Sequence, residues 1–293
     1  MAQKTKIGWT DCTSNPIVGC TPVSDGCKNC YALRMARRLK GTGLLRYQGV
    51  VGCNGHWNGR IAIVPAELAK LRRMGKPRRI FLGSMSDLFH NSVPPGFLHD
   101  VFATIGACPQ HEFTILTKRM GMAWHVLKGW LPLANLLIGP SIENERTADE
   151  RMPPAIALAM KGWRIYVSNE PALGLVRWAR YGLKHIAGLV CGGETGPGAR
   201  PMHPAWARDA RDACLRAGVP FFFKKWGGHV PYQDNGPLPE HCSYVGIDGT
   251  VRLGDWEADT DACMGRLLRG EKPNRLLDGV LWDGCPEREE GTK

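Results

Sequence analysis

The sequence predicts an α/β protein built on a full or partial parallel (β/α) TIM-like barrel. Short apolar runs recur along the chain without strict alternation, which is typical of parallel strands that are covered on both faces. Helical stretches fill the gaps between these runs, as parallel βα units require. We expect seven barrel strands, at residues 15–19, 79–83, 113–117, 136–139, 163–167, 188–191 and 219–223.

A basic helix follows the first expected strand. Apolar residues recur at helical spacing over residues 31–40, and Gly41 is a plausible terminator. Residues 42–78 do not fit a single βα repeat, so we expect an insertion after the first helix. Within it, residues 60–64 predict a short strand, and Pro65 predicts the start of a helix.

The C-terminal part of the chain loses the βα pattern. A last barrel helix is expected to begin at Pro204 and to end before Gly218. Beyond it we expect a barrel domain over residues 1–227, with a small extension over residues 228–293 packed on it. Residues 247–250 predict a hairpin turn within that extension.

Composition and charge exclude several classes of protein. The chain has 293 residues, of which 43% are hydrophobic, enough for a large buried core and too many for a disordered chain. The formal net charge of +11 favours an anionic partner such as nucleic acid or a phosphorylated substrate. No apolar run approaches the roughly 18 residues that span a bilayer, and residues 1–8 lack the apolar stretch of a signal peptide. We therefore expect a soluble, intracellular protein without a membrane partner.

Three of the eleven cysteines form a tight group directly after the first expected strand. Cys20, Cys27 and Cys30 lie at the carboxyl end of that strand, where barrel enzymes carry their reactive groups. A cubane iron–sulfur cluster usually takes four thiolates, so three would leave one iron open. The amino and carboxylate groups of S-adenosylmethionine (SAM) could fill that position. The alternative is a zinc site with Cys12 as a fourth thiolate, but Cys12 and Cys20 make a loosely spaced ligand pair. The placement of the three cysteines between the first expected strand and a basic helix favours the cluster.

Polar and charged side chains also follow the other expected strands. Short acceptors at a barrel mouth suit an ammonium group, so one set of candidates is assigned to the amino group of SAM. A second set is assigned to its ribose or carboxylate, and a third to substrate binding or catalysis. These sets are Ser84, Ser86 and Asp87; Ser141, Glu143 and Asn144; and Lys118, Glu170, Glu194 and Lys224. Two alternatives stay open. Asp87 could be the N-cap of the helix that follows it, and Glu170 and Glu194 could be structural ion-pair partners.

Several motifs together resemble a phage-associated family, largely of unknown function, that carries a three-cysteine motif. That family is similar to the radical SAM superfamily. The motifs are Trp9-Thr-Asp, Asn15-Pro-Ile-Val-Gly-Cys20, Ser24-Asp-Gly-Cys-Lys-Asn-Cys-Tyr-Ala32, Ser84-Met-Ser-Asp-Leu-Phe89, Leu116-Thr-Lys-Arg119, Gly192-Gly-Glu-Thr-Gly-Pro-Gly-Ala-Arg-Pro-Met202 and Phe222-Phe-Lys-Lys-Trp-Gly227. The resemblance implies a [4Fe-4S] cluster on the three cysteines, SAM as cosubstrate, a 5′-deoxyadenosyl radical and an external electron donor. The three-cysteine motif of this chain departs from the commonest motif of the superfamily in its first gap. Six residues separate Cys20 from Cys27 here, instead of three.

The basic residues predict the partner. Residues 70–79 carry six positive charges without an acid, and Arg34, Arg37 and Arg38 add to them near the cysteines. We therefore expect a radical enzyme that modifies or repairs a nucleobase or nucleoside, in DNA more than in RNA, within the cytoplasm (of the host if the protein is phage-encoded). Tyr47, Trp57 and Trp226 are candidates for stacking a base. The alternatives are a zinc-stabilised nucleic-acid-binding protein without catalysis, and a radical SAM enzyme for a small metabolite or peptide.

Overall fold

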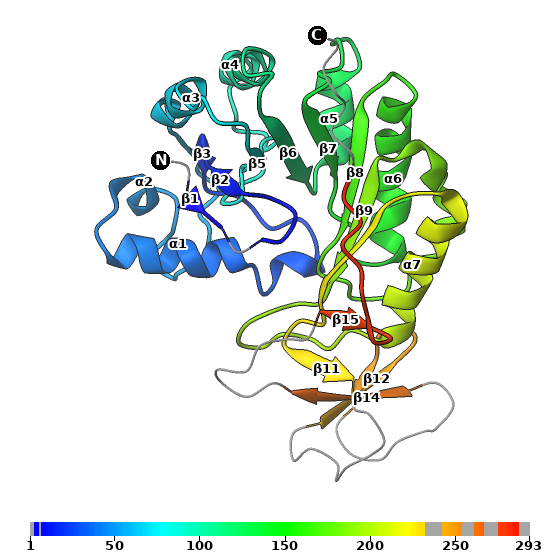
Figure 1. Cartoon of the computed structure of the whole chain (residues 1–293). Helices are drawn as coiled ribbons and strands as arrows, with labels where there is room; N and C mark the ends of the chain where they lie inside the picture. The colour runs from blue at the N-terminus through cyan, green and yellow to red at the C-terminus, as the bar shows by residue number, and fades with distance from the viewer. Residues whose placement is uncertain (1–2, 6, 232–241, 253–260, 267–274, 287–293) are drawn as a thin grey trace.

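The described chain forms a half-barrel of seven parallel strands with helices on its convex side (Figure 1). The computed structural model describes residues 3–5, 7–231, 242–252, 261–266 and 275–286. The sheet has the order β1-β2-β5-β6-β7-β8-β9-β10, in which β1 alone is antiparallel. The strands are β1 (Gln3–Lys4), β2 (Cys12–Ser14), β5 (Arg79–Leu82), β6 (Glu112–Thr117), β7 (Leu136–Pro140), β8 (Arg164–Asn169), β9 (Gly188–Gly192) and β10 (Phe221–Lys225). The predicted fold class is confirmed.

The first barrel strand lies earlier than predicted. On the side away from β6, β5 pairs in parallel with β2, through the pairs Cys12 with Ile80 and Ser14 with Leu82. The apolar residues expected there form β3 (Ile17–Val18), which pairs antiparallel with β4 (Ala62–Ile63) of the insertion. Pro16 separates β2 from β3 and has no N–H to continue a ladder, so the chain leaves the barrel sheet at that point.

The helices cover one face of the sheet and leave its concave face to the site. They are α1 (Tyr31–Gly41), α2 (Leu45–Gln48), α3 (Pro65–Arg72), α4 (Pro95–Gly106), α5 (Met120–Leu127), α6 (Glu145–Ala159) and α7 (Pro204–Ala217). The expected helices over 31–40, from Pro65 and from Pro204 are confirmed. Gly218 ends α7 in the left-handed region with φ 67°, which glycine adopts without strain. The main core lies between the helices and the outward-facing strand residues, such as Ile138 and Val167. No described helix is long and apolar enough to cross a membrane.

The insertion and the C-terminal residues add small elements to this frame. The insertion carries α2, β4 and α3 beside α1, as expected. After β10 a small sheet forms from β11 (His229–Pro231), β14 (Asp261–Arg266), β12 (Cys242–Gly246) and β13 (Val251–Arg252), with the predicted hairpin between the last two. A ribbon of β15 (Leu276–Leu277) and β16 (Val280–Leu281) follows, and the Trp282 carbonyl accepts from Phe223 N–H on β10. A domain boundary at residue 227 stays a prediction.

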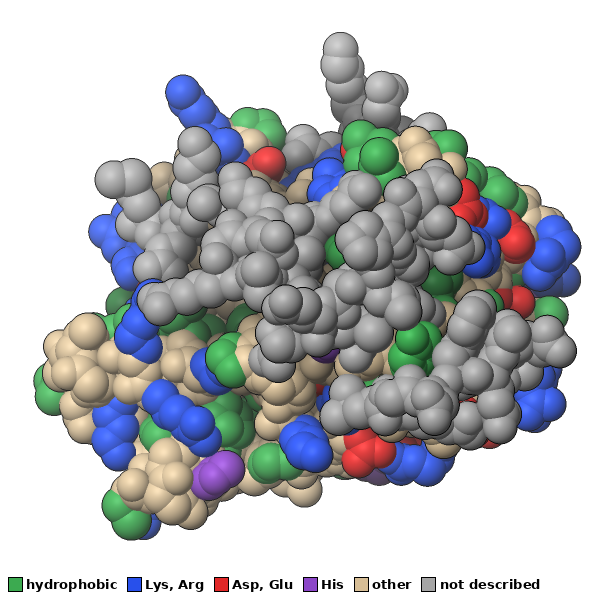
Figure 2. All heavy atoms as spheres, turned by 90° about the horizontal axis from the view of Figure 1, so that it is seen from below, with side chains coloured by type: hydrophobic (Ala, Val, Ile, Leu, Met, Phe, Trp, Pro, Cys, Tyr) green, Lys and Arg blue, Asp and Glu red, His purple; other side chains and the backbone are tan. Residues whose placement is uncertain are grey.

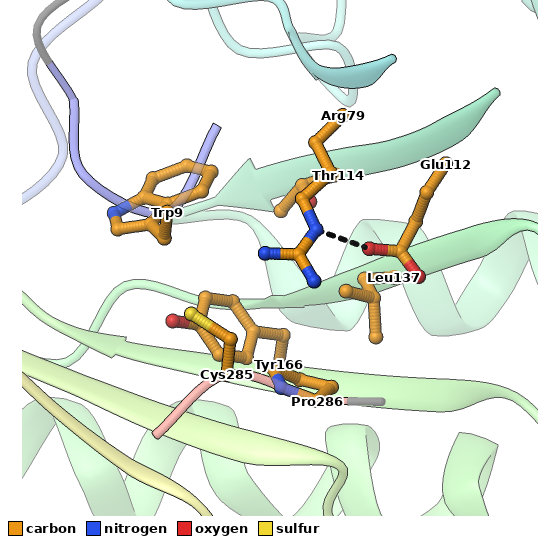
Figure 3. A pocket seen from close by; sticks show the side chains of 8 residues that line it. All are labelled: Trp9, Arg79, Glu112, Thr114, Leu137, Tyr166, Cys285 and Pro286. Carbon is orange, nitrogen blue, oxygen red and sulfur yellow. Dashed lines mark ion pairs between the residues drawn. The ribbon is translucent and has the colours of Figure 1, made fainter. Parts of the chain in front are cut away.

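The concave face is filled at the amino end of the strands. Trp9, Phe81, Tyr166 and Phe222 pack together there as a separate apolar cluster. Figure 3 shows the pocket at this end, where Arg79 pairs with Glu112. Its volume is about 10 Å³, which is too small for a substrate. The open end of the half-barrel is therefore the carboxyl end, as in other β/α barrels.

Candidate functional site

The three predicted cysteines lie on one loop at the carboxyl end of the barrel strands. This cysteine loop (residues 19–30) begins at Gly19, which bridges to Ser86 beyond β5, and it ends at Cys30, the N-cap residue of α1. A short 3₁₀ turn, η1 (Asp25–Cys27), lies between them, and the Cys30 N–H donates to the Cys27 carbonyl at 3.3 Å. All three thiols are free and half-buried. The sequence therefore brings three accessible sulfur donors to the barrel mouth.

Asp87 and Arg119 hold the first part of the cysteine loop. Arg119 contacts Asp87 Oδ2 through Nη1 at 3.0 Å and donates through Nη2 to the Thr21 carbonyl at 3.0 Å. Its Nη1 also lies 3.8 Å from Cys20 Sγ. Asp87 accepts further from the Lys118 N–H at 3.0 Å, which ties it to the end of β6. Burial, together with the Asp87 charge, raises the pKa of Cys20 to about 11 against the opposing effect of Arg119.

Glu143 holds the middle of the loop. Its Oε1 accepts from Ser24 Oγ at 2.7 Å, from Lys118 Nζ, and from Arg151 Nη1 at 3.4 Å. The carboxylate is fully buried, and burial alone would raise its pKa. Lys118 and the hydrogen bonds outweigh burial and lower the pKa of Glu143. A Cβ on Gly26 would lie 2.6 Å from Glu143 Oε1, so the loop passes close over this group.

Glu194 and Arg200 hold the last part of the loop. Glu194 Oε2 accepts from Asn29 Nδ2 at 2.8 Å, and Arg200 contacts Glu194 Oε1 at 2.6 Å. Arg200 Nη2 also donates to the Asp25 carbonyl at 3.0 Å, so both partners reach the cysteine loop. Burial would raise the pKa of Glu194, but the hydrogen bonds from Arg200 and Asn29 lower it. Asn29 and Glu194 are 165 positions apart in the sequence, and Asp25 and Arg200 are 175 apart, so distant segments of the chain meet at this mouth.

The two candidate serines after β5 lie beside the start of the loop. Ser84 Oγ donates to Asn15 Oδ1 at 3.1 Å, and its carbonyl accepts from the Tyr31 hydroxyl at 2.6 Å. Within the described part of the chain, Ser86 Oγ is buried and has no hydrogen-bond partner. A buried hydroxyl that lacks a partner is costly, so Ser86 is the better candidate to bind a polar ligand group.

The candidates after β7 have structural partners. The Ser141 carbonyl accepts from Arg151 Nη1 at 2.7 Å. Asn144 is the N-cap of α6, and its side chain accepts from Thr147 N–H at 3.1 Å within a capping box. The capping role accounts for Asn144 without a ligand.

Glu170 and Lys224 form an ion pair that faces the concave side. Lys224 Nζ lies 2.9 Å from Glu170 Oε1, and Ser168 Oγ donates to Glu170 Oε2 at 3.4 Å. Gly192 lies two residues beyond Val190 of the concave cluster, so it presents the same face of β9. A Cβ there would lie 3.0 Å from Glu170 Oε1 and 3.3 Å from Lys224 Cβ, which places the pair on that face.

The arrangement of the three cysteine thiols differs in its fit to the two predicted metal groups, a single zinc ion and an iron–sulfur cluster. Among the described residues, no group of three or more His, Cys, Asp or Glu side chains converges on a point that could hold one metal ion. Cys12, the fourth ligand of the zinc alternative, is buried in the main core on β2. In a cubane each thiolate binds a different iron, so the three half-buried thiols of the cysteine loop have the donor chemistry of that group without having to meet at one point.

Several functional residues had no role in the sequence prediction. Asn29 and Arg200 lie within the quoted motifs, but their contacts join distant segments and leave no signal in spacing. Tyr31 is half-exposed at the mouth, while its hydroxyl is enclosed against Ser84. Of the aromatic residues predicted to stack a base, Tyr47 and Trp226 are buried, which removes them as candidates. Their apolar neighbours in the insertion and in the main core account for that burial.

Comparisons with known proteins place this chain within a sequence family. The profile of a family described as "Protein of unknown function (DUF5131)" matches residues 4–286. No curated protein matches the sequence. Solved structures of spore photoproduct lyase resemble the fold at low similarity. A cysteine-to-serine mutant matches with 14% identity and a TM-score of 0.45 over 91% of this chain and 71% of that one.

Two further structures of the same protein give similar values. Spore photoproduct lyase complexed with dinucleoside spore photoproduct matches with 14% identity and a TM-score of 0.46, over 76% of this chain and 79% of that one. A mutant with bound AdoMet and dinucleoside spore photoproduct matches with 13% identity and a TM-score of 0.43, over 91% and 71%. Similarity at this level concerns the fold alone.

Proposed function

The chain belongs to the DUF5131 family of proteins of unknown function, and we propose that this member is a radical SAM enzyme. In this proposal Cys20, Cys27 and Cys30 hold a [4Fe-4S] cluster at the carboxyl mouth of the half-barrel. The observation that carries it is the cysteine loop, which three buried or half-buried carboxylate groups fasten across that mouth. A catalytic barrel needs its reactive group at this end of the strands.

The chain's own residues would position the cofactors. The cluster, when bound with SAM, supplies one-electron cleavage of the sulfonium and so a 5′-deoxyadenosyl radical. The buried Ser86 Oγ, beside the Gly19 bridge, is the group that we assign to the amino group of SAM. Asp87, Glu143 and Glu194 would hold the loop in register with the strands. The fixed loop would also limit water at the mouth, which a reactive radical requires.

We further propose that the substrate is a nucleobase or nucleoside of DNA or RNA, with DNA favoured, and that an external donor supplies the electron. Lys28, Arg37 and Arg38 are exposed on the cysteine loop and on α1. Among the described residues, none of the three forms an ion pair with an acidic side chain. In the lower left of Figure 2, on the side that carries α1 in Figure 1, Lys and Arg side chains gather on the surface. Such unpaired cations suit a phosphate backbone.

Anaerobic reconstitution tests the proposed reaction. The purified protein is loaded with iron and sulfide, reduced with dithionite and mixed with SAM, and 5′-deoxyadenosine is measured by chromatography. We expect iron binding, oxygen-sensitive visible absorbance and 5′-deoxyadenosine that requires both dithionite and the cluster. Stoichiometric zinc without iron binding, or an iron-loaded protein that leaves SAM intact, would overturn the proposal.

A further inference from the structure

Four carboxylates follow the barrel strands at the mouth, and one of them differs from the other three. Asp87, Glu143 and Glu194 each contact the cysteine loop or a cation that holds it. Among the described residues, Glu170 forms no hydrogen bond or ion pair with that loop: its partners are Lys224 at 2.9 Å and Ser168 at 3.4 Å. The first three groups therefore have a structural task that Glu170 does not share.

The Glu170–Lys224 pair lies at the carboxyl ends of β8 and β10, within the mouth. A Cβ on Gly192 would lie 3.0 Å from Glu170 Oε1 and 3.3 Å from Lys224 Cβ, so glycine leaves the space beside the pair open. The side chains of Glu170 and Lys224 are 16% and 26% exposed, so a ligand can reach them.

We propose that Glu170 and Lys224 bind the hydrogen-bonding edge of the substrate nucleobase. This inference rests on the proposed function, and it narrows the four substrate candidates to two. An ionised carboxylate only accepts and an ammonium only donates, so together they offer one acceptor beside one donor. Nucleobase edges carry the complementary pattern, in which an N–H lies next to a carbonyl oxygen or a ring nitrogen.

The same geometry does not suit a single trans backbone amide. In a trans peptide the N–H and C=O of one amide point in opposite directions, so a single amide cannot meet both partners of a pair 2.9 Å apart. A nucleobase ring holds its donor and acceptor on the same side. The half-exposed ring of Tyr31 adds an aromatic surface at the same mouth, on which a base can stack.

Nucleoside binding tests this pair independently of turnover. Titration calorimetry on wild-type protein compares thymidine with N3-methylthymidine, and 2′-deoxyadenosine with its N6,N6-dimethyl derivative. Each methylated compound lacks the N–H group that would donate a hydrogen bond to Glu170. We expect at least one parent nucleoside to bind about tenfold or more tightly than its methylated partner. Glu170→Gln should reduce that preference, because the charged acceptor is lost. Lys224→Met should weaken the binding of both compounds of a pair alike, because both keep the acceptor that Lys224 would meet. Glu145→Gln, which alters a surface ion pair on α6, should leave affinity and preference unchanged.

The measurements separate this inference from the proposed function. Binding is measured on both reconstituted and metal-free protein, and iron content is determined for every variant. Glu170→Gln should load iron as the wild type does, because Glu170 does not hold the cysteine loop. Equal binding of the parent and methylated nucleosides by the wild type, or no nucleoside binding, would overturn the inference while leaving iron loading intact. Failure to bind iron, with the methyl discrimination preserved, would instead overturn the radical SAM assignment alone.

Discussion

Arg119 shows how single residues at the mouth combine two tasks. Its guanidinium contacts Asp87, the Thr21 carbonyl and Cys20 Sγ, so it neutralises a buried carboxylate and also places a cysteine. Lys118, the preceding residue, neutralises Glu143, which in turn accepts from Ser24 of the cysteine loop. Consecutive cations at the end of β6 therefore serve two different carboxylates. The planar guanidinium of Arg119 has several donors, which suits a residue that contacts three groups. The compact ammonium of Lys118 suits a residue that pairs with one carboxylate.

Substitution of the cysteines tests the ligand set. Cys20→Ala, Cys27→Ala and Cys30→Ala should each lower the iron bound after anaerobic reconstitution by at least about tenfold, because each removes one thiolate ligand. Cys12→Ala should bind iron as the wild type does, since Cys12 lies in the main core. Iron and visible absorbance are measured after desalting. Loss of metal in the Cys12 variant would indicate a different ligand set.

The substitution Glu143→Gln tests how much the buried carboxylate contributes to stability, through the pH dependence of the free energy of unfolding. The pKa of Glu143 is lowered on folding, so its contribution to stability is present above its ordinary value of 4.5 and is lost as the pH falls through the folded value. Removing the charge leaves Lys118 and Arg151 without their carboxylate partner, which should cost about 3 kcal/mol at pH 7. Urea unfolding at pH 7 and in acid measures the difference between wild type and variant. The difference should shrink in acid, and a constant difference would contradict this assignment.

At the scale of elements, the later barrel strands were predictable from the sequence, whereas the first parallel strand, β2, was not. Runs such as residues 136–140 and 188–192 are apolar and wholly buried, so their pattern alone marks them. Strand β2 has the sequence Cys-Thr-Ser, which carries no such signal, and the apolar residues beyond Pro16 drew the prediction to β3. The cysteine loop was predictable from its spacing. Its anchors were not, because they pair across the chain through tertiary contacts.

The cysteine loop should be preformed before any metal binds. If Glu143 and Glu194 hold it, Glu143→Gln and Glu194→Gln should raise the alkylation rates of Cys27 and Cys30 in the metal-free protein. A loss of one charge-assisted hydrogen bond is expected to increase opening by roughly tenfold. Iodoacetamide labelling followed by peptide mass spectrometry measures the rates.

A matched control exists on the outer surface of the same protein. Asp278 is also a carboxylate held by arginines, Arg208 and Arg211, but it lies beside α7 and contacts no part of the cysteine loop. Asp278→Asn should leave the labelling rates unchanged. Equal rates in the wild type and both glutamate variants would show that the loop owes its position to other contacts.

At the scale of the whole molecule, charge and topology point to the same end of the barrel. The net charge is +11, and the four carboxylates at the mouth are all paired with cations. The unpaired cations on α1, Arg37 and Arg38, follow the last cysteine by seven and eight residues, which places them about 10 to 12 Å from it along the helix axis. A polyanion drawn to this surface would therefore lie beside the cluster site, so that attraction and chemistry share one location.

The salt dependence of nucleic-acid binding tests this arrangement. Single-stranded DNA should bind the wild type about tenfold more weakly at 200 mM than at 50 mM salt, as two or three phosphate contacts imply. The double substitution Arg37→Ser and Arg38→Ser should reduce the slope of log K against log salt, because two of those contacts are lost. Lys161→Ser removes a cation that lies over the Trp124 ring, away from α1, and should leave the slope unchanged. Fluorescence anisotropy with a labelled oligonucleotide measures all three proteins. Binding that is indifferent to salt, or equal slopes for all three, would place the phosphate contacts elsewhere and separate the basic helix from the substrate.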